Sequence, residues 1–483
     1  MATQEIFHRA RLIPVSGIGS TQEAEERATS ALLAVLSVVR DFSKALLSPL
    51  GASRAEKATV DTYSEVVMNL DRRRIRPDGL IRVTYGKSTW SCLVEVKTGT
   101  NKLDADQINA YWDLARNSGI DHILTVSNEI PPQPGVHPTP GLKVRSNSRV
   151  GVSHYSWSEI VTTAIKIREH SGVDDVEQAW ILGELIRYLQ HPKSGALEFD
   201  DMGPHWVAIR DAARAGDLTK RSEGIEDICE RWDQLLSFVA MRLASDIGED
   251  VTPVLPRNQR DPRQRRASVV NSLVTTGLLN GSLKVPNTAG NIDVQADLRA
   301  QQLTASIDVG APEDRGSRAR ITWLLRQLDD APGEIVVEAY PKAARTPTTA
   351  TLDRLRDDRD AGLNEQRQEP ARFRVLMRRP MGMSRSVGRK SQGFITSVLD
   401  LVDEFYGSVV QRITPWQRPA PQLKRQAPAQ RDLERATESD DSAWVETNGG
   451  PTAPSETEAS ASDDDQRPVD LPTSADGGGP GRT

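Results

Sequence analysis

The chain contains very little cysteine and no long hydrophobic run. Cys92 and Cys229 are the only cysteines in 483 residues, and the seven histidines are scattered, which excludes a disulfide framework and a His/Cys zinc cluster. No apolar stretch reaches the roughly eighteen residues of a membrane-spanning helix, and the first residues lack the apolar segment of a signal peptide. We therefore expect reduced cysteines, no membrane partner and a cytoplasmic location.

Acidic charge is concentrated at the C-terminus. The net charge of the chain is −6, but residues 431–483 hold thirteen acidic and four basic residues, so the other 430 residues carry a net charge of +3. This end is rich in Ser, Thr, Pro, Gly and Asp, so residues 416–483 are predicted to be a disordered acidic tail. The simpler interpretation is a solubilising tail. The alternative is a tail that mimics nucleic acid and competes for the basic body.

Two carboxylates and a lysine mark a predicted β-hairpin. Residues 79–85 and 89–97 are rich in β-branched and aromatic residues, and a Gly-Lys turn lies between them, a pattern typical of paired strands. Asp78 precedes the first strand, whereas Glu95 and Lys97 end the second strand and share one of its faces. If the strands pair near the turn, Asp78 lies close to Glu95 and Lys97.

These three side chains suit the hydrolysis of a phosphodiester bond. Carboxylate oxygens bind Mg²⁺, which usually takes only one or two carboxylates from the protein. The metal polarises the phosphoryl oxygen and lowers the pKa of bound water, and a neighbouring lysine orients the water, accepts its proton or offsets charge on the phosphate. The alternative is a hairpin with ordinary surface charges, which the apolar second strand argues against because unneeded charges there are costly.

A helix and a strand are predicted after the lysine. The helix covers residues 102–118 with Asp104 as its N-cap, and it places Gln107 and Tyr111 on one face because they are four residues apart. A buried strand follows at residues 122–127.

Upstream, residues 21–47 are predicted to form one long amphipathic helix. Its apolar stripe comprises Ala28, Leu32, Val35, Val39, Phe42 and Leu46. One helical step before this stripe lies Glu25, which is therefore expected on the inward face; Glu26 is the less well-placed neighbour. Residues 65–70 are predicted as the first strand of the sheet.

The order helix, three strands, helix, strand, with these residues, resembles the PD-(D/E)xK nuclease superfamily. The resemblance covers roughly residues 20–160, and Gln107 and Tyr111 look like the Gln-x-x-x-Tyr element of its RecB-type branch. It implies an α/β restriction-endonuclease-like core with the element order αβββαβ.

The resemblance also implies roles for individual residues. Asp78, Glu95 and the backbone carbonyl of Val96 would bind Mg²⁺ or Mn²⁺, and Lys97 would be the catalytic lysine. An accessory acid would be Glu25. The residues that position the lysine or the nucleic acid would be Gln107 and Tyr111.

The function implied is a metal-dependent nuclease, acting on DNA rather than RNA, in defence, repair or stress response. Members of this superfamily can lose the chemistry and keep binding, so the alternative is a nucleic-acid-binding or regulatory module built on a decayed nuclease core. In a third interpretation, the C-terminal domain carries the function and the N-terminal domain is structural.

The rest of the chain is divided by composition. A nuclease-like domain at residues 1–170 is followed by a helical region at 171–252, a Pro/Arg-rich linker or exposed basic loop at 253–267, and an α+β domain at 268–415 without a catalytic constellation. Arginines cluster at residues 372–389, which favours a role of this last domain in binding nucleic acid, a protein partner or a second copy. A homodimer is considered because many cuts need two active sites.

Overall fold

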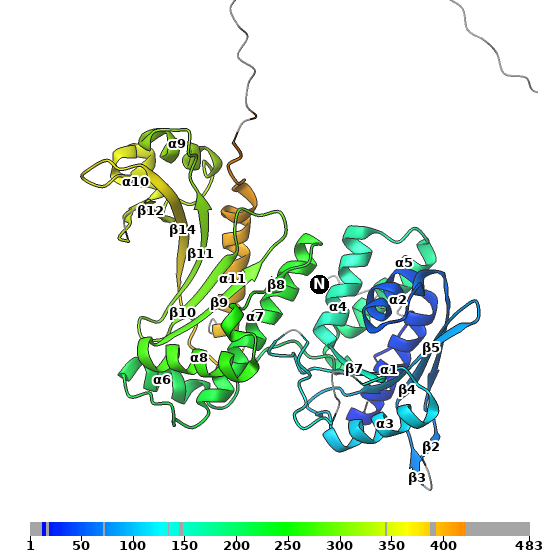
Figure 1. The fold of residues 1–483 in the computed structure, drawn as a ribbon. Helices are drawn as coiled ribbons and strands as arrows, with labels where there is room; N and C mark the ends of the chain where they lie inside the picture. The colour runs from blue at the N-terminus through cyan, green and yellow to red at the C-terminus, as the bar shows by residue number, and fades with distance from the viewer. Residues whose placement is uncertain are drawn as a thin grey trace, which may run out of the picture. The chain divides into compact units, whose positions relative to one another are not determined.

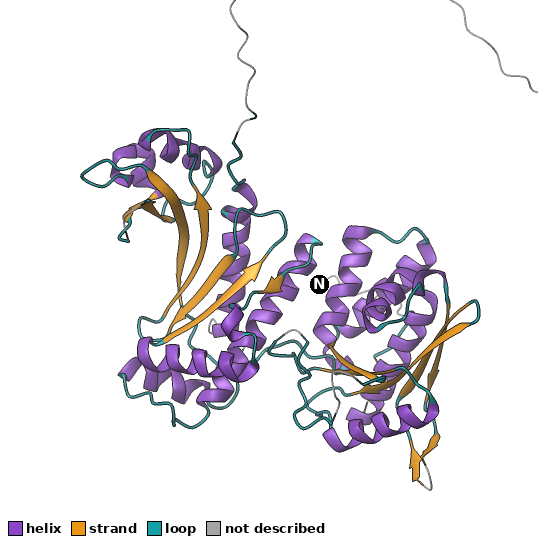
Figure 2. Cartoon of the chain, viewed as in Figure 1, coloured by secondary structure: helices purple, strands orange, loops and turns teal. Residues whose placement is uncertain are grey.

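Two β-sheets with flanking helices organise the chain, which makes it a mixed α/β protein, as predicted (Figures 1 and 2). This computed structural model describes residues 12–420 except 16–18, 71–72, 134, 144–147, 343–344, 387–392 and 419. By the contacts between its residues, the chain divides into two units, Met1–Pro419 and Ala420–Thr483. Most of the predicted acidic tail, from residue 421 onward, lies outside the described residues, and the predicted boundaries at 170, 252 and 267 stay predictions.

The first sheet has five strands in the order β1-β4-β5-β6-β7. These are β1 (Thr59–Ser64), β4 (Gly79–Tyr85), β5 (Ser88–Val96), β6 (His122–Ser127) and β7 (Gly151–Ser156). Strand β4 pairs antiparallel with β1 and β5, whereas β6 runs parallel to β5 and β7. Two short strands, β2 (Met68–Leu70) and β3 (Arg73–Ile75), form a separate hairpin between β1 and β4 in the sequence.

Helices cover both faces of this sheet. One face packs against α1 (Thr21–Val38), α2 (Arg40–Leu47), α4 (Trp157–Ile165) and α5 (Val176–Leu189), and the other against α3 (Ala105–Ser118). Alternate residues of β5 separate the two cores: Cys92 and Val94 lie in the first, Leu93 in the second. Burial on both faces explains why the end of β5 is apolar apart from its charged site residues.

The prediction of a single helix over residues 21–47 is wrong, because the helix is interrupted at Val39, between α1 and α2. A capping box between Ser20 and Glu23 starts α1, as this residue pair favours. Val39 is extended (φ −90°, ψ 101°) and fully buried, and its carbonyl accepts a hydrogen bond from Ser43 Oγ at 3.0 Å. Adjacent β-branched residues weaken the helix here, and the break lets both halves bury their apolar faces.

The predicted first strand is also wrong. Residues 65–70 do not join the sheet; β1 ends at Ser64, and Glu65 has a left-handed backbone (φ +53°). The hairpin of β4 and β5 forms as predicted, with Tyr85 paired to Ser88 across the turn and Gly86 at φ +61°. Glycine adopts this φ without steric cost.

The second sheet has seven antiparallel strands in the order β13-β12-β14-β11-β10-β9-β8. They are β8 (Thr252–Pro253), β9 (Leu278–Lys284), β10 (Ile292–Asp297), β11 (Gln302–Gly310), β12 (Val336–Pro341), β13 (Thr348–Thr351) and β14 (Pro370–Pro380). The helices of this part are α6 (Trp206–Ala215), α7 (Ile225–Ile247), α8 (Pro262–Thr276), α9 (Ser317–Gln327), α10 (Leu352–Asp357) and α11 (Phe394–Ser408). No helix in the described ranges is both long and apolar enough to span a membrane.

The segment predicted as a Pro/Arg-rich linker or exposed basic loop, residues 253–267, is largely regular structure. It contains the end of β8, a 3₁₀ turn and the first turns of α8, which begins at Pro262 with Asp261 as N-cap. Arg265 is buried and contacts Asp233 of α7 at 2.7 Å. This ion pair explains why Arg265 is buried, whereas the other four arginines of the segment are exposed, as an exposed basic stretch predicts.

Candidate active site

The hairpin of β4 and β5 brings Asp78 to the end of β5. Gly79 pairs with Val94 in this antiparallel pair. Asp78, which precedes Gly79, therefore lies beside Glu95, which follows Val94. The Val96 amide donates a hydrogen bond to Asp78 Oδ2 at 2.8 Å. The juxtaposition predicted from the hairpin is therefore present.

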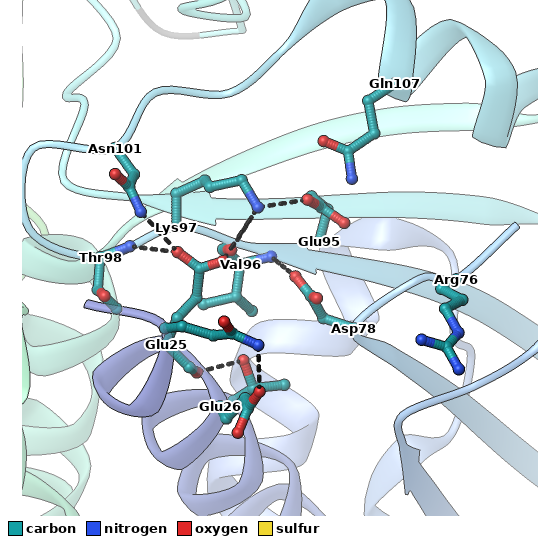
Figure 3. Close-up of polar contacts among 12 residues, drawn as sticks. Glu25, Glu26, Arg76, Asp78, Glu95, Val96, Lys97, Thr98, Asn101 and Gln107 are labelled. Atoms are coloured by element: carbon teal, nitrogen blue, oxygen red, sulfur yellow. Dashed lines mark hydrogen bonds and ion pairs between the residues drawn. The ribbon is translucent and has the colours of Figure 1, made fainter. Parts of the chain in front are cut away.

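The ammonium of Lys97 lies among three oxygens (Figure 3). Its Nζ is 2.6 Å from Glu95 Oε1, 3.1 Å from Glu25 Oε1 and 3.2 Å from the carbonyl oxygen of Val96. The side chain of Lys97 is 16% exposed and that of Glu95 is 1% exposed, so a partly buried cation lies among anionic and carbonyl oxygens. Such a charge is tolerated inside a protein only when it is paired in this way.

Helix α1 supplies Glu25 rather than Glu26, as its periodicity predicts. The second carboxylate oxygen of Glu25 accepts hydrogen bonds from the Thr98 amide at 3.4 Å and from Asn101 Nδ2 at 3.3 Å. In contrast, Glu26 is exposed and accepts from Gln22 on its own helix. Glu25 therefore joins α1 to the loop after β5.

Helix α3 fixes the other side of Glu95. Tyr111 donates its hydroxyl toward Glu95 Oε2 at 2.8 Å and toward the Arg76 carbonyl at 3.0 Å, and Gln107 Nε2 donates to the same hydroxyl at 2.8 Å. Asp104 is the N-cap, as predicted, and accepts from the Gln107 amide, but the helix begins at Ala105 rather than at residue 102. All the predicted site side chains thus lie in one connected network.

Burial shifts the acid–base properties of this network. Burial, reinforced by the negative charge of Asp78, raises the pKa of Glu95 to about 7. Burial also raises the pKa of Asp78 above its ordinary value, although the Val96 amide opposes the shift. Burial alone would lower the pKa of Lys97, but Glu95 and Glu25 raise it overall, so the lysine stays an ammonium.

The donor set suits a hard divalent cation. Carboxylate and carbonyl oxygens are the ligands that Mg²⁺ and Mn²⁺ prefer, and here the oxygens of Glu95, Glu25 and Val96 already surround a positive charge. Among the described residues, however, no three His, Cys, Asp or Glu side chains are grouped so that they could hold an ion. Asp78, Glu95 and Val96 could hold a metal if the ammonium of Lys97 moved away from Glu95.

Sequence reasoning missed the residues that hold the loop after β5. Trp157 is buried and its Nε1 donates to the Lys97 carbonyl at 2.9 Å, and Asn101 binds Glu25. Neither belongs to a periodic pattern with the site residues. No sequence signal at Asn101 or Trp157 could have identified them without the tertiary structure.

No family model matches the chain, and neither the curated proteins nor the solved structures contain a match.

Proposed function

We propose that the chain is a metal-dependent nuclease with a restriction-endonuclease-like core that hydrolyses phosphodiester bonds of DNA. The observation that carries this proposal is the set of three oxygens, from Glu95, Glu25 and Val96, around the ammonium of Lys97, with Asp78 hydrogen-bonded beside them. The order α1, β1, β4, β5, α3, β6 supports the proposal, because it is the order expected of such a core.

Each residue has a role in the proposed reaction. Mg²⁺ or Mn²⁺ would be held by Asp78, Glu95 and the Val96 carbonyl, and a bound metal would supply an acidified water and polarise the phosphate. Lys97 orients the attacking water and offsets charge on the phosphate. Glu25 holds the lysine as an accessory acid, while Gln107 and Tyr111 fix the carboxylate of Glu95.

The choice of DNA over RNA, and a setting in defence, repair or stress response, are proposed from the sequence resemblance alone. A cytoplasmic location, a homodimer and a protein partner for residues 268–415 are likewise proposed from the sequence.

The test is cleavage of linear and circular plasmid by purified protein with Mg²⁺, Mn²⁺ or chelator. We expect degradation that needs metal and disappears in Lys97→Ala, but persists in Lys87→Ala, whose lysine is exposed in the turn of the same hairpin. Loss of the linear form alone would indicate that the enzyme needs a DNA end. Metal-dependent cleavage that survives both Lys97→Ala and Asp78→Ala would disprove the assignment.

A second candidate is a nucleic-acid-binding or regulatory module with a decayed site. It is favoured by one observation: the ammonium of Lys97 lies 2.6 Å from Glu95, within the oxygen set that a metal would need. This candidate predicts DNA binding that Mg²⁺ does not change and no cleavage with any metal.

A further inference from the structure

A groove opens beside Asp78, between α1 and the base of the β2–β3 hairpin. It has a volume of about 580 Å³ and is lined by side chains that include Gln22, Glu26 and Ser30 of α1, Glu65 after β1, and Arg76 before Asp78. This volume falls within the range of small-ligand sites. The groove ends at a residue proposed to bind metal, so any substrate at that site lies next to it.

The lining of the groove selects against a phosphate chain. Three of its residues, Glu26, Glu65 and Asp78, are acidic, whereas Arg76 is the single cation among the lining residues. A row of phosphates along Glu26 and Glu65 would be repelled. Carboxylates, an amide and hydroxyls instead match the edge of a nucleobase, since a carboxylate accepts hydrogen bonds from an exocyclic amino group.

Arg76 is placed to bind one phosphate at the mouth of the groove. Its side chain is exposed, and no ion pair within the described part of the chain includes it. Its backbone is fixed, because Tyr111 donates to its carbonyl at 3.0 Å, and it lies two residues before Asp78 (Figure 3). A free guanidinium held this way offers a phosphate two parallel hydrogen bonds.

The backbone of Glu65 fixes the opposite wall of the groove next to Asp78. Glu65 has φ +53°, which is uncommon for a residue other than glycine, asparagine or aspartate. Its amide donates to the Asp78 carbonyl at 3.1 Å, so the strained turn is tied to the candidate active site.

We propose that this groove binds the nucleobase next to the scissile phosphate, that Arg76 binds the phosphate of that nucleotide, and that bases with an amino group are preferred to thymine. The inference rests on the proposed nuclease function and adds a base preference to it. Phosphate contacts fix the position of a nucleic acid, whereas contacts to base edges select its sequence.

The test measures binding of fluorescent single-stranded oligo(dC), oligo(dA) and oligo(dT) in Ca²⁺, with cleavage assayed separately in Mg²⁺ and Mn²⁺. We expect wild-type protein to bind oligo(dC) and oligo(dA) roughly tenfold more tightly than oligo(dT). The double variant Glu26→Ala/Glu65→Ala should bind oligo(dT) more tightly and lose the preference. If its affinity rose equally for all three strands, the carboxylates would act only as repelling charges and the inference would be wrong.

Arg76→Ala should weaken binding of all three strands alike and reduce the slope of log affinity against log salt by about one. Arg82→Ala is the matched control, because Arg82 is an exposed arginine of β4 outside the groove; it should change neither quantity. Base-selective binding without cleavage would refute the proposed nuclease and keep only the part of this inference that assigns base binding to the groove. Cleavage by a protein that binds the three strands equally, or that does not bind them, would refute the inference and keep the nuclease.

Discussion

The Asp78 carboxylate accepts a hydrogen bond of 2.8 Å from the Val96 amide, which joins the start of β4 to the end of β5. This bond fixes a carboxylate beside a backbone carbonyl, because the same residue, Val96, presents its own oxygen to Lys97 at 3.2 Å. One residue of β5 thus orients a carboxylate through its N–H and an ammonium through its C=O. Asp78, Glu95 and Lys97 lie at the adjacent ends of two paired strands, which favours a precise geometry.

Asp78→Asn should separate chemistry from folding. Asparagine keeps an oxygen that can accept from the Val96 amide, but it removes the charge that a metal needs. We expect cleavage to fall by roughly 100-fold or more, as for loss of one strong electrostatic contact in an active site, with the melting temperature unchanged or raised. Asp61→Asn, at an exposed position of β1, is the control and should keep full activity.

The raised pKa of Glu95 predicts a pH dependence of stability. Without metal, the folded protein keeps a proton on Glu95 up to about pH 7, whereas the unfolded chain loses it near pH 4.3. Between these values the folded state binds the extra proton, so the free energy of unfolding falls as pH rises, by at most about 4 kcal/mol from this group.

Melting temperatures of wild type and Glu95→Gln in chelator between pH 5 and 8 isolate this effect. The wild type should lose stability relative to the variant as pH rises from 5 to about 7, and the difference should level off above that pH. Added Mn²⁺ should stabilise the wild type more at pH 8 than at pH 6, because at pH 6 it must first displace the proton. Parallel curves for the two proteins would mean that Glu95 stays ionised throughout.

Tyr111→Phe removes a hydroxyl that contacts Glu95, Gln107 and the Arg76 carbonyl. We expect a loss of about 1–3 kcal/mol in the free energy of unfolding, since buried partners are left unsatisfied, together with a drop in cleavage. Tyr155→Phe removes a hydroxyl that donates only to the Leu46 carbonyl among the described residues. It should cost similar stability in chemical denaturation but leave cleavage intact.

The ion pair between Arg265 and Asp233 should stabilise the second sheet and its helices. Both side chains are buried, and Arg265 also donates to the Asn280 carbonyl at 3.1 Å. Arg265→Ala leaves Asp233 without its partner and should cost about 3–5 kcal/mol. Arg266→Ala removes an exposed arginine with longer contacts to Glu226 and Glu230, and should cost about 0.5 kcal/mol or less in urea unfolding.

The candidate site was predictable where local patterns determine placement. Strand alternation and a short turn bring Asp78, Glu95 and Lys97 together, and helical periodicity selects Glu25 over Glu26. Tyr111 and Gln107 follow from their spacing on one helix. These relationships need only the geometry of one hairpin and two helices.

Features that depend on distant partners were not predictable. Asn101 lies in the loop after β5 and donates to Glu25. Trp157 donates to the carbonyl of Lys97, which is 60 positions earlier in the sequence. The Pro/Arg-rich composition around Arg265 is typical of a linker, whereas in the structure Arg265 lies in a folded helix and pairs with Asp233, 32 positions earlier in the chain. The first strand of the sheet is predicted at residues 65–70 but lies at β1 (Thr59–Ser64). This segment is mostly polar, and its strand conformation depends on pairing with β4.

The seven-stranded sheet ends at its two shortest strands, β8 with two residues and β13 with four. One of the two residues of β8 is Pro253, which has no amide hydrogen to offer a further strand. Short edges of this kind oppose the addition of a foreign strand and so protect against edge-to-edge aggregation. Any protein that joins this part of the chain is therefore expected to meet side chains on a face of the sheet or on its helices, rather than extend its backbone ladder.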